Sequence, residues 1–135
     1  MVSACLLGRN CKYNGGNNLN EKVMEFVKGH TVIPVCPEVL GGLPTPRKPA
    51  EIVGEVVRKA DGTSVDGEFR LGAHKALETA LSEGVELVIL QPRSPSCGSK
   101  QRYDGTFTGK LIEGRGIFAQ LLIDHNIKVI DADEL

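Results

Sequence analysis

The sequence predicts an α/β fold: a three-layer, Rossmann-like α/β/α arrangement around a mostly parallel four-stranded sheet, with an inserted β-hairpin. Short apolar runs alternate along the chain with segments of helical periodicity, the pattern of β-α-β units joined by right-handed crossovers. Trp is absent and aromatic residues make up only 4% of the chain, so Val, Ile, Leu and Ala must form the core. Such a core suits parallel strands that are covered by helices on both faces.

Length and composition restrict the class of protein. A chain of 135 residues predicts a single domain, residues 1–135, that folds without needing a cofactor. The net charge of −1, with both signs mixed, indicates no nucleic-acid partner, and no apolar run approaches the ~18 residues of a membrane span. The N-terminus shows no signal segment, so we expect a cytoplasmic protein, a monomer or weak homo-oligomer, whose four cysteines stay reduced.

The first half of the chain predicts two strands separated by a helix. The strands are the short apolar runs Val2–Leu6 and Val32–Cys36. After a loop rich in Gly and Asn, the helix begins at Asn18 or Asn20, either of which is a good N-cap, and it ends before Gly29. The residues expected to be buried on this helix are Val23, Phe26 and Val27.

The second half predicts the hairpin, two helices and two strands. The weakly alternating stretch from Ile52 to Val65 has Asp61-Gly62 at its centre, which is a turn signal. A helix from Gly67 to Glu83 has one apolar face, formed by Phe69, Ala73, Ala76, Leu77, Ala80 and Leu81. The remaining elements are a strand at Val85–Leu90, a long loop at 92–113, a helix at Arg115–His125 and a strand at Ile127–Ile130.

Three of the four cysteines lie where predicted strands end. Cys5 and Cys36 lie at the ends of the first two strands, and Cys97 follows the third, just after Ser94 and Ser96. Ligands of open α/β sheets bind beyond the carboxyl ends of the strands, so we expect the three thiols to converge. One cysteine alone is usually a small buried hydrophobe, but three favour a metal or iron–sulfur site with an open coordination position. The serines are expected to bond the local backbone, and one of them could orient a substrate or pass a proton.

Three further residues near these cysteines have more than one interpretation. Cys11 would complete a four-thiolate zinc site if it reached the others, but we expect the first loop to carry it away from the strand ends. Glu38, two residues after Cys36, is either a solvated loop carboxylate or a general base or acid beside the metal. Arg47 could hold an anionic group, although exposed arginines are common.

Several stretches of the chain also carry a resemblance. They are residues 3–8, 11–15, 36–47, 94–98, 105–109 and 114–116. Together they resemble the thiouracil desulfidase family, a small bacterial domain. The most specific are the Cys-Pro-Glu-x-x-Gly-Gly stretch that begins at Cys36 and the Ser-Pro-Ser-Cys-Gly stretch that begins at Ser94. The resemblance covers essentially the whole chain.

The resemblance implies an enzyme that removes sulfur from a thiolated nucleobase or a similar thiocarbonyl compound. The implied reaction is a non-redox hydrolysis that converts a 2-thiouracil-like small molecule to uracil and hydrosulfide. The implied cofactor is a 4Fe–4S cluster held by Cys5, Cys36 and Cys97, with one iron not ligated by the protein. Glu38 and Ser94 are the implied catalytic residues. Two other classes stay open: a metal- or cluster-binding sensor or structural module, and a persulfide-based sulfur-transfer enzyme.

Overall fold

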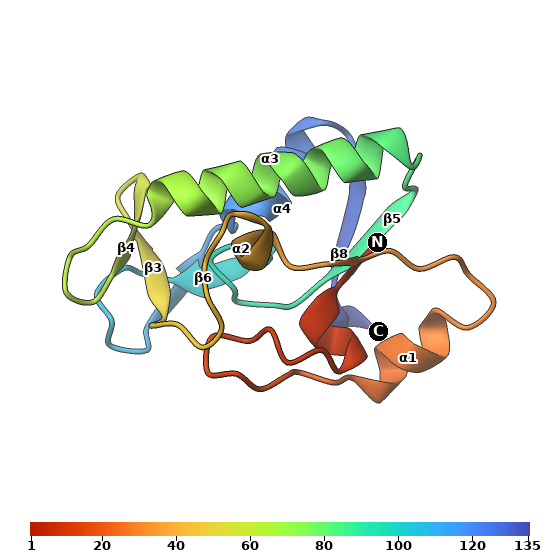
Figure 1. The fold of residues 1–135 in the computed structure, drawn as a ribbon, viewed down its shortest axis with the longest axis horizontal. Helices are drawn as coiled ribbons and strands as arrows, with labels where there is room; N and C mark the ends of the chain where they lie inside the picture. The colour runs from red at the N-terminus through yellow and green to blue at the C-terminus, as the bar shows by residue number, and fades with distance from the viewer.

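The computed structural model describes residues 1–135 and has a four-stranded, wholly parallel sheet in the order β2-β1-β5-β8 (Figure 1). Its strands are β1 (Val2–Ser3), β2 (Pro34–Val35), β5 (Leu87–Leu90) and β8 (Lys128–Asp131). The predicted α/β fold class is therefore confirmed. Because all four strands run the same way, their carboxyl ends meet along one edge of the sheet.

Helices cover both faces of this sheet. The helical elements are α1 (Glu21–Phe26), α2 (Pro37–Leu40), α3 (Asp66–Ser82) and α4 (Ile117–Asp124), with short 3₁₀ helices η1 (Ala4–Leu7) and η2 (Ala132–Glu134). Successive residues of β5 enter two different cores. Val88 and Leu90 pack in the cluster formed with α3 and α4, whereas Ile89 packs with Leu6 and Val23 on the opposite face. This alternation produces the predicted three layers.

The first two strands are shorter than predicted. After Ser3 the chain turns into η1, which ends at Gly8 in the left-handed conformation with φ 89°. The second strand ends at Val35, because Cys36 is the N-cap of α2, a helix that the sequence pattern did not reveal. Asn20 is confirmed as the N-cap of α1, since its side chain accepts a hydrogen bond from the backbone N–H of Val23 at 3.1 Å.

Two residues predicted to be buried are exposed. Phe26 is 44% exposed, because α1 ends at this residue and its ring stacks on His30 rather than entering the core. Leu81 is 55% exposed near the end of α3. Both residues lie at or near the end of their helix, where helical spacing alone does not determine burial.

The inserted hairpin is present, with an additional turn before the predicted one. Strands β3 (Ala50–Val53) and β4 (Val56–Lys59) join through Gly54, which has φ 65°. The predicted turn at Asp61-Gly62 follows β4: the Gly62 N–H donates to the Lys59 carbonyl at 2.9 Å, and an antiparallel bridge joins Arg58 to Ser64 across it. The long predicted loop contains another hairpin, β6 (Gln101–Tyr103) and β7 (Leu111–Glu113).

The short helix α2 lies against α3 at a contact that only glycine permits. A Cβ atom on Gly72 would lie 1.7 Å from the Pro37 carbonyl oxygen, and one on Gly41 would lie 1.9 Å from that of Glu68. Both distances are far below van der Waals contact. The two glycines therefore fix the distance of α2 from α3, and with it the position of the chain from Cys36 to Gly41.

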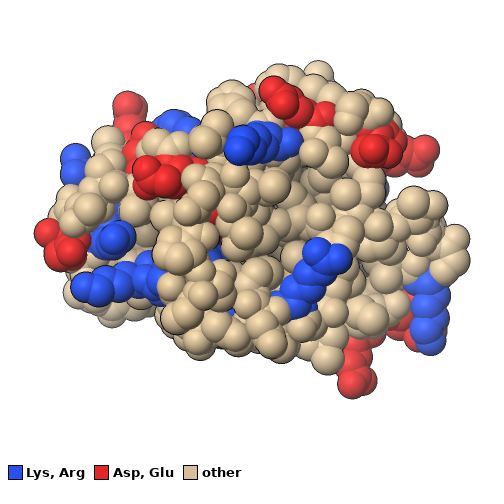
Figure 2. Space-filling model, in the orientation of Figure 1, with Lys and Arg blue, Asp and Glu red and all other residues tan.

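Charges of both signs are interspersed on the face drawn in Figure 2, and the region between α2 and α1 carries few of them. No helix of the structure combines the length and the apolar character that a membrane span requires.

We expect Gly72→Ala to lower the free energy of unfolding by about 1–3 kcal/mol, because the added methyl group must push α2 away from α3. Urea unfolding followed by circular dichroism measures this change. Gly67→Ala is the matched control on the same helix, since no atom lies within 4 Å of its added Cβ. Equal unfolding free energies for the two variants would contradict the glycine contact.

Candidate active site

Cys5, Cys36 and Cys97 line one cavity of about 590 Å³ beyond the carboxyl ends of β1, β2 and β5. Glu38 and Ser94 line the same cavity. The structure thus brings together all five residues that the sequence and the resemblance pointed to. Cys97 is the most enclosed, with 5% of its surface exposed, while Cys5 and Cys36 are partly buried.

Backbone hydrogen bonds fix the turns that carry Cys5 and Cys36. The carbonyl of Cys5 accepts from the N–H groups of Gly8 at 3.2 Å and Asn18 at 3.0 Å, which ties η1 to the end of the first loop. The carbonyl of Cys36 accepts from the N–H of Leu40 at 3.0 Å as the first bond of α2. Both cysteines are therefore held by their own main chain and not only by packing.

The turn that carries Cys97 is fixed by the N-terminus of α4. The first N–H groups of a helix have no partners within it. Here the carbonyl of Pro95 accepts from Ile117 at 2.8 Å, and that of Ser96 accepts from Phe118 at 2.9 Å and Ala119 at 3.1 Å. The helix start and the cysteine turn thus satisfy each other's backbone groups.

Ser94 stabilises the same turn from the other side. Its hydroxyl oxygen accepts from the backbone N–H groups of Ser96 and Cys97, each at 3.1 Å. The local backbone role expected for such a serine is therefore present. A hydroxyl that accepts two hydrogen bonds still has its own proton to donate, so Ser94 remains able to bond a substrate or a water molecule.

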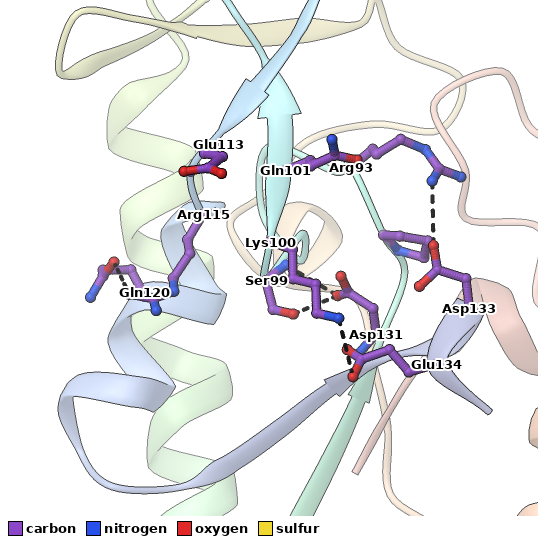
Figure 3. Close-up of a pocket in the computed structure, with 12 residues that line it drawn as sticks. Arg93, Ser99, Lys100, Gln101, Glu113, Arg115, Gln120, Asp131, Asp133 and Glu134 are labelled. Carbon is purple, nitrogen blue, oxygen red and sulfur yellow. Dashed lines mark hydrogen bonds and ion pairs between the residues drawn. The ribbon is translucent and has the colours of Figure 1, made fainter.

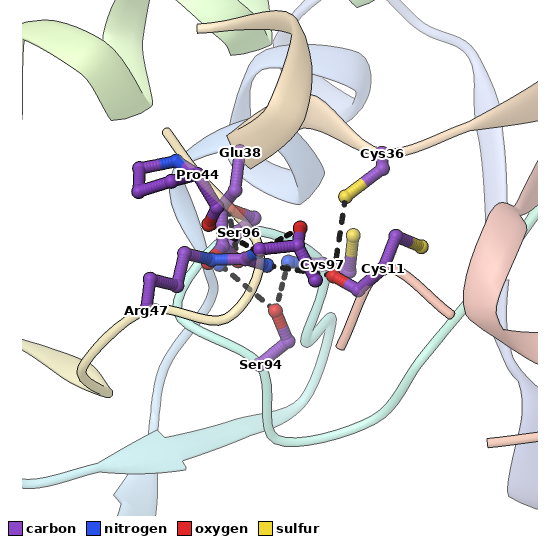
Figure 4. Close-up of polar contacts among 9 residues, drawn as sticks. Cys11, Cys36, Glu38, Pro44, Arg47, Ser94, Ser96 and Cys97 are labelled. Atoms are coloured by element: carbon purple, nitrogen blue, oxygen red, sulfur yellow. Dashed lines mark hydrogen bonds and ion pairs between the residues drawn. The ribbon is translucent and has the colours of Figure 1, made fainter. Parts of the chain in front are cut away.

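Glu38 is held by one partner on each carboxylate oxygen (Figure 4). Oε1 accepts from Nε of Arg47 at 3.1 Å, and Oε2 accepts from the hydroxyl of Ser96 at 3.1 Å. Only 15% of the Glu38 side chain is exposed, so the interpretation as a solvated loop carboxylate is wrong. The carboxylate stands in the cavity wall two residues from a thiol, where a proton acceptor can act.

The thiols differ in how their pKa values are shifted. Burial raises the pKa of Cys97, and repulsion from Cys5, Glu38 and Cys36 raises it further. Burial also raises the pKa of Cys5. The pKa of Cys36 is lowered to about 6, chiefly by its interaction with Cys11. These mutual effects show that the three predicted thiols and the carboxylate share one electrostatic environment.

Cys11 is not carried away from the strand ends, contrary to our expectation. It lines the same cavity, and its interaction with Cys36, together with burial, raises the pKa of Cys11. Sγ of Cys36 lies 4.0 Å from the Cys11 carbonyl oxygen, at the outer limit for a thiol donor (Figure 4). The first loop folds back because the Arg47 backbone N–H donates to the Tyr13 carbonyl at 2.7 Å.

Sequence reasoning missed the importance of Arg47 and underrated Ser96. Arg47 was expected either to hold an anionic group or to be an ordinary exposed arginine; its side chain is only 8% exposed and holds the carboxylate of Glu38. Ser96 is 1% exposed and bonds Glu38 across 58 positions of sequence. The one available signal was that both residues lie within the stretches that resemble the thiouracil desulfidase family.

Three aromatic side chains, Tyr13, Tyr103 and Phe107, also line the cavity. The whole chain has only two Tyr and four Phe residues, so half of its aromatics gather here. Phe107 has φ 59°, an uncommon conformation for a large side chain, and its backbone N–H donates to the Glu51 carboxylate at 3.2 Å. An aromatic wall of this kind suits a planar ligand.

A larger cavity, of about 920 Å³, lies beside the ends of β5 and β8 (Figure 3). It has no hydrophobic lining residue, and its charges pair with each other: Arg93 lies 3.5 Å from Asp133, and Lys100 lies 3.4 Å from Glu134. This cavity holds no thiol and no aromatic side chain, so the smaller one is the candidate active site.

No three His, Cys, Asp or Glu side chains of the protein stand close enough together to hold a single metal ion. A polynuclear cluster places different demands on its ligands, because each thiolate binds a different iron atom and the thiols must stand farther apart.

Comparisons with known proteins identify the family of this chain. The chain is 41% identical to the uncharacterized protein YbbK of Bacillus subtilis, over all of this chain and 96% of that protein. The solved structure of the [4Fe-4S]-dependent thiouracil desulfidase TudS superposes with a TM-score of 0.92 at 42% identity, covering 99% of this chain and 90% of that one. The family described as 2-thiouracil desulfurase matches residues 1–134. The protein therefore belongs to the 2-thiouracil desulfurase family.

Proposed function

We propose that this protein is a 4Fe–4S-dependent enzyme that hydrolytically releases sulfur from a thiolated nucleobase or a similar small thiocarbonyl compound, with no net electron transfer. The observation that carries the proposal is the convergence of three thiols and a clamped carboxylate on one cavity of about 590 Å³. Family membership and the likeness to a [4Fe-4S]-dependent thiouracil desulfidase support it.

The residues of the cavity fit the proposed cluster. Cys5, Cys36 and Cys97 supply three soft sulfur donors from three separate turns, as an iron–sulfur cluster requires. They are not grouped tightly enough for one metal ion. Three protein ligands would leave one iron without a protein ligand. When bound, such a cluster supplies a thiophilic Lewis acid that polarises a thiocarbonyl group.

The protein's own groups account for the proton transfers. Glu38 takes a proton from the water molecule that attacks the thiocarbonyl carbon, and its two fixed partners hold it in place to do so. Ser94 donates its free hydroxyl proton to the substrate or to that water, because its oxygen is already occupied by two backbone N–H groups. Tyr13, Tyr103 and Phe107 supply apolar contact area for a planar ring.

One observation favours a second candidate, the persulfide-based sulfur-transfer enzyme. Cys11 and Cys36 line the same cavity, the pKa of Cys36 is lowered to about 6, and a thiolate is the form of cysteine that attacks sulfur. This route would operate without a cluster, and its sulfur would come from a persulfide or another sulfane donor, because thiocarbonyl sulfur is already at the oxidation level of sulfide. The third class, a sensor or structural module, would bind a metal or cluster without turnover. Activity of the cluster-free and cluster-loaded proteins separates the three.

We expect Cys5→Ser, Cys36→Ser and Cys97→Ser each to lose the cluster, because each removes one of only three thiolates. Cys11→Ser should retain it. Iron, sulfide and zinc assays on anaerobically purified protein measure the outcome, together with the broad absorbance of thiolate-bound iron. Iron loss from Cys11→Ser as complete as from the others would show a closed four-thiolate site instead. Stoichiometric zinc without iron would refute the cluster.

We expect Glu38→Gln to retain the cluster and bind 2-thiouracil but to release sulfide about 10²- to 10⁴-fold more slowly, since the amide cannot accept a proton. The loss should appear in kcat and not in KM, because the missing interaction belongs to the transition state. Ser94→Ala should slow sulfide release less than Glu38→Gln does, because a water molecule can replace the hydroxyl group in proton transfer. Single-turnover sulfide release under argon, at matched iron content, measures both variants.

Three results would overturn this mechanism. Release from Glu38→Gln at the wild-type rate would remove Glu38 as the base of the reaction, and release by cluster-free protein would refute the role of the cluster. Absence of release by the wild type from every thiolated base tested would favour the sensor or structural module.

A further inference from the structure

We propose that Arg47 and Ser96 are positioning residues that hold the Glu38 carboxylate in the orientation required for proton transfer. This inference rests on the proposed function, because it assigns how the base of that reaction is kept in place. Neither residue needs to touch the substrate for this role. Their effect on the reaction passes through Glu38 alone.

The two contacts hold the carboxylate from opposite ends. Nε of Arg47 lies 3.1 Å from Oε1 of Glu38, and the Ser96 hydroxyl lies 3.1 Å from Oε2 (Figure 4). Each bond occupies part of the acceptor capacity of one oxygen. A carboxylate has about four acceptor sites, so capacity remains for a water molecule. With both oxygens anchored, the group cannot rotate freely about its terminal bond.

Arg47 is itself immobilised, which an arginine making one surface ion pair would not be. Nη1 donates to the Pro44 carbonyl at 3.2 Å and to the Thr45 hydroxyl at 3.1 Å, while Nη2 donates to the Cys11 carbonyl at 2.9 Å. Its planar guanidinium thus joins Glu38 to two loops at once. Lysine cannot reproduce this arrangement, because its ammonium group lacks the rigid fork of donors.

Ser96 is equally fixed. It is 1% exposed, its carbonyl accepts from the first N–H groups of α4, and its own N–H donates to the Ser94 hydroxyl at 3.1 Å. A Cβ on Gly116 would lie 2.5 Å from the Ser96 carbonyl carbon and oxygen, so the backbone there has no room to shift. The Ser96 hydroxyl therefore provides a rigid second anchor for the carboxylate.

The other arginine–carboxylate pair with a short contact provides a control. Nε of Arg70 lies 2.8 Å from Asp66 on α3, but the Arg70 side chain is 47% exposed and neither residue lines the candidate site. Arg70→Met removes an arginine side chain and its ion pair, and Arg70 does not contact Glu38. This variant shows how far the loss of an arginine–carboxylate pair outside the site changes kcat.

The test is steady-state and single-turnover sulfide release from 2-thiouracil by cluster-loaded protein under argon. We expect Arg47→Met to lower kcat by about 10- to 100-fold, the effect of misplacing a reacting group by about 1 Å, with KM and iron content little changed. Ser96→Ala should lower kcat less, because Arg47 remains. Arg47→Lys should recover part of the Arg47→Met loss, and Arg70→Met should behave as wild type.

A double-mutant comparison shows whether Arg47 acts through Glu38. In a Glu38→Gln background, Arg47→Met should cause little further loss of kcat, because residues that act as one unit are not additive. Fully additive losses would overturn the positioning role, as would a rise in KM alone or a loss of iron that accounts for the whole decrease. Wild-type kcat in Arg47→Met would overturn it as well. No release by the wild-type enzyme would instead refute the proposed function itself.

Discussion

The contact between α2 and α3 determines where the candidate site stands. The Pro37 carbonyl oxygen approaches Gly72 so closely that no side chain fits between the two helices. Cys36 precedes this contact by one residue and Glu38 follows it by one, so a thiol and a carboxylate are placed by the same backbone approach. Helix α3 is the longest element and packs on the sheet that positions Cys5. The close contact between α2 and α3 thus fixes Cys36 and Glu38 relative to the sheet that positions Cys5.

Helix packing positions only part of the site, and polar interactions fix the rest, because most of the site is built from loops. The stretch from Gly8 to Asn20 and the stretch from Leu43 to Pro49 contain no strand and no regular helix. Burying the ion pair of Glu38 and Arg47 costs solvation free energy unless the remaining N–H groups of Arg47 also have hydrogen-bond acceptors. The Cys11 and Pro44 carbonyls and the Thr45 hydroxyl satisfy them. The network that satisfies the buried charge also closes the loops over the cavity.

The sequence predicted those features that depend on periodicity and chain order. The parallel sheet, α3, α4 and the convergence of Cys5, Cys36 and Cys97 all follow from the alternation of strands and helices. Exact strand ends did not follow, because η1 begins directly after Ser3 and α2 begins directly after Cys36, and these changes of backbone geometry leave no apolar pattern. The second hairpin was missed because its strands have only three residues each.

Partners that are distant along the chain lie beyond such reasoning. Ser96 reaches Glu38 only because α4 fixes one turn and α3 fixes the other, and no local pattern encodes that meeting. The position of Cys11 has the same origin, since it depends on the hydrogen bond between Arg47 and Tyr13. The amino-acid composition does give information about the cavity wall. The core is built from aliphatic side chains and does not need the rings of Tyr13, Tyr103 and Phe107, which line the cavity instead.

Phe107 illustrates how such a ring is retained at a cost in backbone strain. A bulky residue at φ 59° is unfavourable unless its surroundings fix it. The Glu51 carboxylate does so by accepting hydrogen bonds from the Gly105 and Phe107 N–H groups at 3.0 and 3.2 Å. Strain of this kind persists where it serves a site, and here it holds an aromatic side chain in the wall of the cavity that contains the thiols. The strained loop and the cysteine turns therefore line one cavity.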